Sequence, residues 1–352
     1  MYRLYIASFS VKAFKIQISF QLCTNKGIRT FEMIESKLFK VIRTFDGHEK
    51  NMAEKFLRSV YFNENESLLN LFKEIISREE KELTKQKIFS KLFPKKKFSD
   101  LKFRRQCSDL LILLEEFLAI RHFQKDEVAL QLNWIKTVND RKLTDLFSHS
   151  HNVGKQKQAK KEFQDADFFL HQYQLEEQLY FHFENLNKRS TEKNLIETVL
   201  NLDSFYIIRK LQYACVILHY GEVVNLETKI PMLDDLLNYL QKNKIENSLI
   251  QNYYFILQML LHPENENHFN QLKLQLSSTE NKIPNSVLRE LYQHAVNYSV
   301  KKINYGKLNY LAEVFDLYKQ MLKQKLLFDG KNLSQWDYKN LVVTACRLRE
   351  FK

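Results

Sequence analysis

The sequence predicts an all-α protein made of antiparallel helix pairs stacked as an irregular, tetratricopeptide-like α-solenoid. The first observation is that only ten of the 352 residues are Gly or Pro, six Gly and four Pro. These two residues usually make up roughly 12% of a chain, which would be about 42 residues here. Tight β-turns depend on them, so the chain can form few hairpins. The second observation is that apolar residues recur at i, i+3, i+4 and i+7 along most of the chain, which is typical of buried helix faces. The predicted helices are joined by short turns, which favours antiparallel packing of sequence neighbours.

Residues 1–32 differ from the rest of the chain. Apolar and polar residues alternate over residues 16–22, and a period of two predicts a strand. At Met33 the period becomes helical. Two interpretations follow: Met33 is the biological start and residues 1–32 are an upstream extension, or residues 1–32 form a poorly ordered arm. The apolar run Leu4–Val11 is interrupted by Lys12 and has no small-residue cleavage site after it, so no signal peptide is predicted.

Residues 33–147 are predicted to form a basic helical module. Asn63 and Glu66 have the spacing of a capping box at the start of one helix. A long helix is expected from about Ser99 to His122. Its apolar stripe consists of Cys107, Leu110, Leu111, Leu114, Phe117 and Leu118. Residues 148–162 are polar, include Gly154 and lack a sustained apolar period, so they are predicted to be a polar linker.

Residues 163–352 are predicted to be a helical-repeat region. One helix is expected from Asp203 to Gly221, a second begins at Pro231, and a third ends before Pro263. A fourth is expected from Pro284 to Gly306. Two more follow, of which one ends at Gly330 and the last is capped by Ser334. The last helix carries an apolar face formed by Leu341, Val342, Ala345 and Leu348. An array normally ends in a helix with a polar outer face. The sequence therefore predicts that this helix frays or self-associates, and that the chain is truncated at its C-terminus.

Several segments resemble an uncharacterised family of helical bacterial proteins. They are Met33–Asp46 (MIESKLFKVIRTFD), Ser59–Glu66 (SVYFNENE), Leu92–Pro94 (LFP), Leu202–Ala214 (LDSFYIIRKLQYA) and Asp329–Asn340 (DGKNLSQWDYKN). The resemblance extends from about Met33 to the end of the sequence. It implies a helical-repeat architecture, a start at Met33 and further C-terminal repeats. No activity is assigned to the family, so it implies no functional residues.

Charge and cysteine content limit the classes of function. The net charge is +12, and residues 81–105 contain ten Lys or Arg against two acids, which would favour an acidic partner. The four cysteines are far apart and form no C-x-x-C pair, so neither a zinc ribbon nor dithiol chemistry is predicted. No window approaches the roughly 20 apolar residues of a membrane span. We therefore expect a cytoplasmic protein without a cofactor and without membrane association.

Three small constellations could carry chemistry, and in each the structural interpretation is favoured. His149 and His151 lie in a polar segment without a third ligand. His262 and His268 flank Glu264 and Glu266, but Pro263 would break the helix that could align these side chains around a metal. Cys215 lies one helical turn from His219, but on an apolar stripe that predicts burial. No catalytic, metal or cofactor residue is predicted, and the expectation is that the protein is not an enzyme.

The leading functional hypothesis is a non-enzymatic helical-repeat scaffold that binds a protein or peptide partner. Stacked helix pairs form a concave groove, and tyrosine suits such a surface because it combines a large apolar area with a polar tip. The predicted groove residues are Tyr253, Tyr254, Tyr292 and Tyr298. The alternative is a nucleic-acid-binding protein that uses the basic 81–105 stretch. Its predicted contacts are Lys95, Lys96, Lys97, Arg104 and Arg105, interleaved with three phenylalanines.

Overall fold

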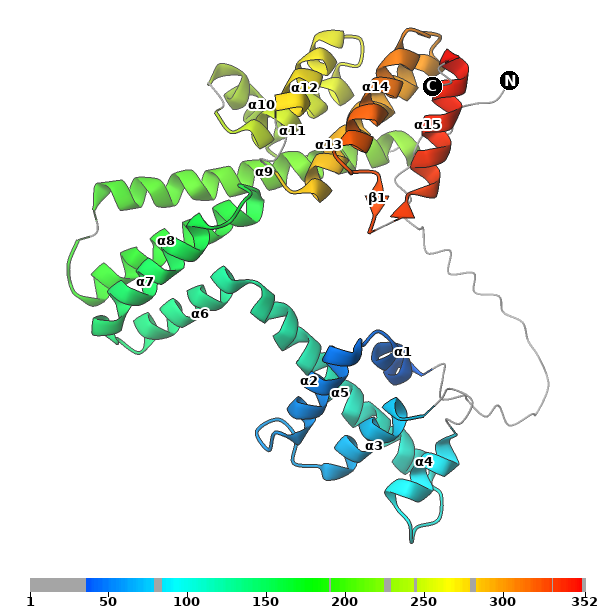
Figure 1. The fold of residues 1–352 in the computed structure, drawn as a ribbon. Helices are drawn as coiled ribbons and strands as arrows, with labels where there is room; N and C mark the ends of the chain where they lie inside the picture. Colours follow the sequence, from blue (N-terminus) through cyan, green and yellow to red (C-terminus); the bar gives the residue numbers. More distant parts are fainter. Residues whose placement is uncertain are drawn as a thin grey trace. The chain divides into compact units, whose positions relative to one another are not determined.

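The computed structural model describes residues 36–78, 84–189, 191–224, 229–243, 246–278, 283–330 and 332–349. These residues form fifteen helices and one short antiparallel hairpin, so the all-α prediction is confirmed (Figure 1). The hairpin pairs β1 (Phe328–Asp329) with β2 (Asn332–Leu333), and Gly330 supplies the positive φ of +62° at its turn. The predicted strand at residues 16–22 and the predicted start at Met33 lie outside the described residues.

The chain divides into two compact units, which among the described residues are 36–130 and 131–349. The division falls within the first turns of α6 (Glu127–Asp140) rather than at residues 148–162. The predicted linker is wrong, because Thr144–Ala159 form helix α7. Its buried face includes Ser150, His151 and Gln158, so burial along this helix does not follow an apolar period.

The unit 36–130 is arranged around the 26-residue helix α5 (Asp100–Lys125), whose N-cap Ser99 accepts a hydrogen bond from the Lys102 backbone N–H. Helices α1 (Lys37–Arg43), α2 (Gly47–Arg58), α3 (Glu66–Ile76) and α4 (Lys85–Leu92) all contact α5. Their apolar faces form one core with Leu110, Leu114 and Phe117 of the predicted stripe. The stripe prediction for α5 is therefore confirmed.

The start of α3 corrects the predicted capping box. The N-cap is Asn65, whose Oδ1 accepts from the Ser67 backbone N–H at 3.1 Å. Asn63 lies two residues earlier: its Oδ1 accepts from the Asn65 backbone N–H, and its Nδ2 donates to the Leu57 carbonyl at 2.8 Å. Asn63 therefore ties the loop to α2 instead of capping α3.

The unit 131–349 contains the rest of α6, α7, and the helices and hairpin that follow. Their bounds are α8 Ala166–Asn185, α9 Glu192–Val224, α10 Leu233–Lys242, α11 Ser248–Leu261, α12 Glu266–Ser278, α13 Asn285–Asn304, α14 Tyr310–Lys323 and α15 Gln335–Leu348. Most helices contact their sequence neighbours, and α11 also contacts α9 and α13. One core runs from α8 to α15.

Helix α9 is longer than the sequence analysis predicts. It continues for 33 residues through Asp203 and Gly221, so the predicted N-cap and C-cap at these positions are wrong. Asp203 lies in the middle of the helix with its side chain exposed, so its carboxylate is solvated there and does not have to cap a helix end. Its first half packs against α8 and its second half against α11 (Figure 1). Tertiary packing on both halves outweighs the local signals for a break.

The later boundaries follow the sequence more closely, except that the helix predicted to end at Gly330 is α14, which ends at Lys323. Helix α11 ends at Leu261, before Pro263, and Pro284 directly precedes α13. Gly306 has a φ of +90°, and its N–H donates to the Ile303 carbonyl just after α13 ends, as predicted for a C-terminal glycine. Ser334 caps α15 by accepting from the Asp337 backbone N–H. Helix α12, with its buried residues Phe269, Leu272 and Leu276, was not predicted.

The apolar face of α15 is better covered than predicted. Leu341 and Leu348 pack against the core, and Thr344 is buried. Asp337 is also buried and accepts from Arg289 of α13 at 2.8 Å. Val342 and Val343 remain exposed. The predicted bare face is therefore only partly bare, and fraying or self-association of this helix stays a prediction.

Gly154 explains how closely α7 approaches its neighbours. A Cβ atom at this position would lie 2.9 Å from Leu175 Cδ2 of α8 and 3.1 Å from Ile135 Cδ1 of α6. Both of these side chains are fully buried. Close-packed interiors accept extra volume only by displacing their neighbours. Gly154 is therefore a packing residue within a helix, and not the loop residue that the sequence analysis predicts.

Replacing Gly154 with Val should destabilise the unit 131–349 by about 2–3 kcal/mol, because the branched side chain overpacks the α6–α7–α8 interface. Gln156→Val is the matched control, since it places the same branched side chain at an exposed position of the same helix. Hydrogen exchange of α7 and α8 peptides measures the local change. Equal loss of protection in both variants would contradict the packing role of Gly154.

Candidate functional site

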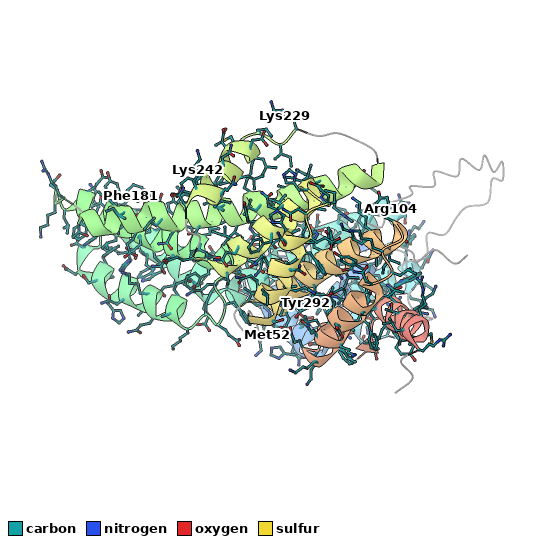
Figure 2. The ribbon with its side chains drawn as sticks, turned by 90° about the horizontal axis from the view of Figure 1, so that it is seen from above. Met52, Arg104, Phe181, Lys229, Lys242 and Tyr292 are labelled. Atoms are coloured by element: carbon teal, nitrogen blue, oxygen red, sulfur yellow. The ribbon has the colours of Figure 1, made fainter. Side chains whose placement is uncertain are left out.

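Three of the four predicted groove tyrosines are core residues. Tyr253, Tyr292 and Tyr298 are buried, and each hydroxyl bonds within the unit, to Glu290, Gln320 and the Pro263 carbonyl respectively. Figure 2 shows Tyr292 within the helical layer, whereas Lys229 and Lys242 lie at its outer edge. The prediction that these three tyrosines line an exposed groove is wrong, because their hydroxyls find partners that let the rings enter the core. Only Tyr254 is half-exposed.

The predicted basic residues are exposed on the other unit. Lys95, Lys96 and Lys97 lie between α4 and α5, and Arg104 and Arg105 lie on the first turns of α5 (Arg104 is labelled in Figure 2). Arg104 forms an ion pair with Asp100 at 2.6 Å. The other four have no ion-pair partner among the described residues. Together with Lys102 these four form a basic cluster, defined as Lys95, Lys96, Lys97, Lys102 and Arg105.

Phe93 organises part of the basic cluster. The Lys102 ammonium lies 3.8 Å from the centroid of the Phe93 ring, and the Lys96 ammonium lies 5.8 Å from it. Partial desolvation and the neighbouring Lys96 lower the pKa of Lys102. Phe98 stands edge-on against Phe89 and is partly exposed, whereas Phe103 is buried in the core. An anion placed between the two ammonium groups would relieve their mutual repulsion.

The histidine motifs do not converge on a metal site. His149 is exposed on α7, whereas His151 is buried, stacks on Phe147 and donates from Nε2 to the Leu175 carbonyl. His268 accepts from Asn265, and Glu266 is paired with Lys302 and Lys307. Within the described parts of the chain, no group of three or more His, Cys, Asp or Glu is placed to hold a metal ion.

Cys215 does not have the environment of a nucleophile. It is fully buried, and burial raises the pKa of its thiol well above the usual range. A nucleophilic cysteine needs the opposite shift, towards the thiolate. Cys215 is instead part of the core between α9 and α11, with its sulfur 3.9 Å from the Tyr253 carbonyl.

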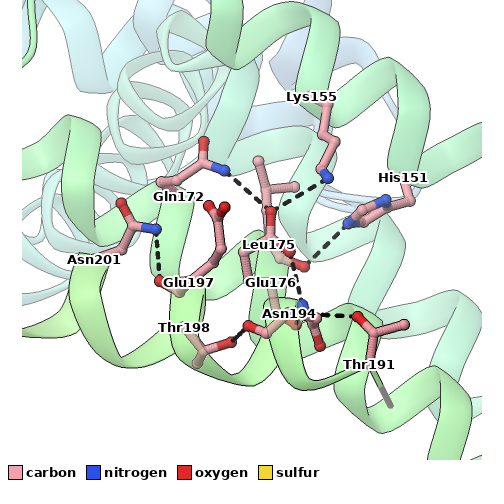
Figure 3. Close-up of polar contacts among 10 residues, drawn as sticks. All are labelled: His151, Lys155, Gln172, Leu175, Glu176, Thr191, Asn194, Glu197, Thr198 and Asn201. Atoms are coloured by element: carbon pink, nitrogen blue, oxygen red, sulfur yellow. Dashed lines mark hydrogen bonds and ion pairs between the residues drawn. The ribbon is translucent and has the colours of Figure 1, made fainter.

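Buried polar groups join α7, α8 and α9 (Figure 3). Glu176 is buried and accepts from Asn194 Nδ2 at 2.7 Å and from Gln172 Nε2 at 3.2 Å, while the Lys155 ammonium lies at 3.3 Å. Asn194 also donates to the Glu176 carbonyl. Similar side-chain bonds reach backbone carbonyls from Gln131, Asn139 and Gln158. The three partners of Glu176 come from α7, α8 and α9 themselves, so this network joins the three helices.

The outer face of α9 carries a long apolar stripe that the sequence analysis missed. Seven apolar side chains on this face are each 39–61% exposed: Leu195, Val199, Leu202, Tyr206, Tyr213, Val216 and Tyr220. With Arg209 they follow one another at intervals of four and three residues from 195 to 220. We call these eight residues the α9 seam. Intervals of four and three are the heptad spacing of a helix that packs against another helix along its length.

The sequence does contain the signal for this seam. A helix that begins at Asp203, as predicted, leaves Leu195, Val199 and Leu202 outside it, and the spacing of four and three residues is then not visible across residue 203. The predicted apolar stripe that contains Cys215 is the opposite, buried face of the helix, and Ile208 and Leu211 lie on the same face. Helix α9 therefore buries one apolar face in its own unit and exposes the other, and an exposed apolar patch of this kind is typical of an interaction site.

None of the described helices is long and apolar enough to cross a membrane. Comparison of the chain with protein-family models, with curated proteins and with solved structures gives no match. The resemblance to a family of helical bacterial proteins therefore stays a prediction.

His294 of α13 should make the stability of the unit 131–349 depend on pH. It is buried beside His219, with ring centroids 6.4 Å apart, and its Nε2 has no hydrogen-bond partner among the residues that the structure describes. Burial, and secondarily His219, lower the pKa of His294 to about 4. Because the unfolded state binds this proton more readily, stability should fall as the pH drops from about 6.5 towards 4. The loss at pH 4 is on the order of 3 kcal/mol.

His294→Gln should remove this part of the pH dependence, whereas His262→Gln, at an exposed position, should leave it unchanged. Urea denaturation at pH 7, 5.5 and 4.5 measures the difference. The same slope of stability against pH in the His294→Gln variant and the parent would show that His294 does not titrate in this way.

Proposed function

We propose that the protein is a non-enzymatic helical scaffold that binds a helical protein partner through the α9 seam. The observation that carries this proposal is the length and regularity of the exposed stripe. It extends over 26 residues, about 38 Å of helix. An α-solenoid arrangement of residues 163–352 and a cytoplasmic location are part of the same proposal.

The area and the shape of the α9 seam both favour a helical partner. A soluble monomer rarely exposes a large contiguous apolar surface without using it. Helix-in-groove and coiled-coil partners read side chains at heptad spacing, and the α9 seam presents that spacing over more than three heptads. Tyrosine is also a favoured interface residue, and three of the eight seam residues are tyrosines.

Photo-crosslinking tests this function. Benzoylphenylalanine placed at Val199 or Val216 should give one discrete adduct in native cells, and the crosslinked peptide should be an amphipathic helix with apolar residues at heptad spacing. Tyr213→Lys should abolish the adduct while leaving the helical circular-dichroism signal unchanged, since Tyr213 is exposed.

Leu274 of α12 is the matched control, because it is 66% exposed on a helix whose main contacts are with α11 and α13. A crosslinker there should give no adduct. Equal adducts at Leu274 and Val199, or a crosslinked peptide without an apolar stripe, would contradict binding through the seam.

A second function is favoured by the basic cluster, which could bind a nucleic acid. Its five cations lie close together in sequence without carboxylate partners among the described residues, and Phe93 and Phe98 lie beside them. Clustered cations bind phosphates and release counterions, which makes affinity depend on salt. Partly exposed aromatic rings can stack on unpaired bases.

Replacing Lys95, Lys96 and Lys97 with Gln should lower the slope of log affinity against log salt. The decrease is about 0.7 for each phosphate of a single strand that is no longer neutralised, so about 2 for the three lysines. Fluorescence anisotropy with a labelled single-stranded oligonucleotide measures the slope. The control variant replaces Lys40, Lys55 and Lys125 with Gln, which removes the same charge from exposed positions elsewhere in the unit. Equal slopes in the two variants, or no binding at 20 mM salt, would exclude this function.

A further inference from the structure

We propose that the α9 seam binds the same seam of a second copy of this chain, with the two α9 helices antiparallel. The inference rests on the proposed function and names its partner. It comes from the order of side chains along the seam and from the charges beside it, which together fit a two-fold axis near residues 207 and 208.

An antiparallel arrangement pairs residues from opposite ends of the seam. Leu195 then faces Tyr220, and Leu202 faces Tyr213 of the second copy. Val199 faces Val216, so that large side chains meet medium ones and the two small side chains meet each other. In an antiparallel coiled coil, the a position of one helix packs in a layer with the d position of the other. Each of these pairs joins an a position to a d position in this way. The seam is therefore complementary to itself in side-chain size.

Arg209 determines the orientation. In a parallel pair it would face its own copy, and two guanidinium groups would meet inside an apolar seam, which is costly. In the antiparallel pair Arg209 faces Tyr206, whose ring can accept a cation on its face. Arg209 is already held in its own chain by Asp167 at 2.6 Å and by Gln212 at 3.1 Å, so its charge is compensated before the second copy binds.

Charges beside the seam give a second, independent indication. Asp203 and Lys210 lie on the same flank of α9, one position after Leu202 and Arg209. Neither has an ion-pair partner among the described residues. In the antiparallel pair Asp203 of each copy lies opposite Lys210 of the other, which creates two equivalent ion pairs. In a parallel pair the flanking positions opposite Asp203 are Thr198 and Phe205, and no ion pair forms.

The remaining flank residues agree with the same axis. Ile196 and Ile217 occupy the equivalent flanking positions near the two ends of the seam, and the antiparallel pairing brings them opposite each other. Near the centre, the Tyr206 hydroxyl lies 3.9 Å from the Met232 sulfur, and Met232 is itself exposed. The centre of the seam is therefore widened by an adaptable apolar side chain.

Charge exchange at the two flank positions tests the dimer in the full chain. Sedimentation equilibrium should give a dimer for the parent. Asp203→Lys should weaken it by about tenfold, because two attractive pairs become repulsive. The combined variant Asp203→Lys with Lys210→Asp should restore the parent's dissociation constant. Leu274→Asp, at an exposed position of α12, should leave it unchanged.

Disulfide trapping tests the orientation. In a background with Cys23→Ser and Cys346→Ser, a chain with Val199→Cys mixed with a chain with Val216→Cys should form a mixed disulfide. Val199→Cys alone should form none, because the two copies of residue 199 lie at opposite ends of the antiparallel pair. A disulfide in Val199→Cys alone would overturn the antiparallel arrangement.

The outcomes separate this inference from the proposed function. A parent that stays monomeric at 100 μM, while the seam crosslinkers still give an adduct with a different protein, overturns the dimer and retains the binding function. A monomer without any seam adduct overturns both. A dimer that survives Tyr213→Lys would show that the chain associates through another surface, which also overturns the inference.

Discussion

The unbroken length of α9 is the constraint on which the unit 131–349 depends. Its first half contacts α8 and its second half contacts α11, so one 33-residue helix holds together elements that are distant in sequence. Helices of this length are stable in water mainly when packing covers a face over most of their length. Here the buried face changes its partner half-way along, while the outer face keeps the same apolar stripe throughout. A break at Asp203 would separate both faces into short segments, neither long enough to specify a helical partner.

The sequence reliably predicts the helices that have apolar stripes and unambiguous ends. The α5 stripe, the Ser334 cap, the limits set by Pro263 and Pro284, and the glycine at 306 were all predicted from local chemistry. Three predicted helix ends or loops are wrong for one reason: the residue types that usually mark such positions are outweighed here by tertiary packing. Asp203 resembles a cap, Gly221 a helix end and Gly154 a loop residue, yet tertiary contacts place all three inside helices. The candidate tyrosines were misplaced for a related reason, since composition does not show whether a hydroxyl finds a buried partner.

The two candidate surfaces differ in how they could be found from sequence. The basic cluster is a run of cations that composition detects directly, and the structure adds that Phe93 holds two of them together. The α9 seam needs the correct helix boundaries before its spacing can be counted. Its side chains alone do not separate an exposed face from a buried one, because Leu, Val and Tyr occur on both. A heptad count across a suspected helix break would have detected it.

The bonds from Gln131, Asn139, His151, Gln158 and Asn194 to backbone carbonyls of neighbouring helices have a mechanical consequence. Purely apolar helices can slide past one another by a turn, about 5.4 Å, and still bury similar surfaces. If α8 took such a step, four of these donors, all except Gln131, would lose their acceptors on α8 at once, and each would be left unpaired in a buried interface. The region around α7 and α8 therefore has one register rather than several near-equivalent ones. We expect this region to resist deformation when force is applied to one end of it. Parts of the unit with fewer such bonds should deform first.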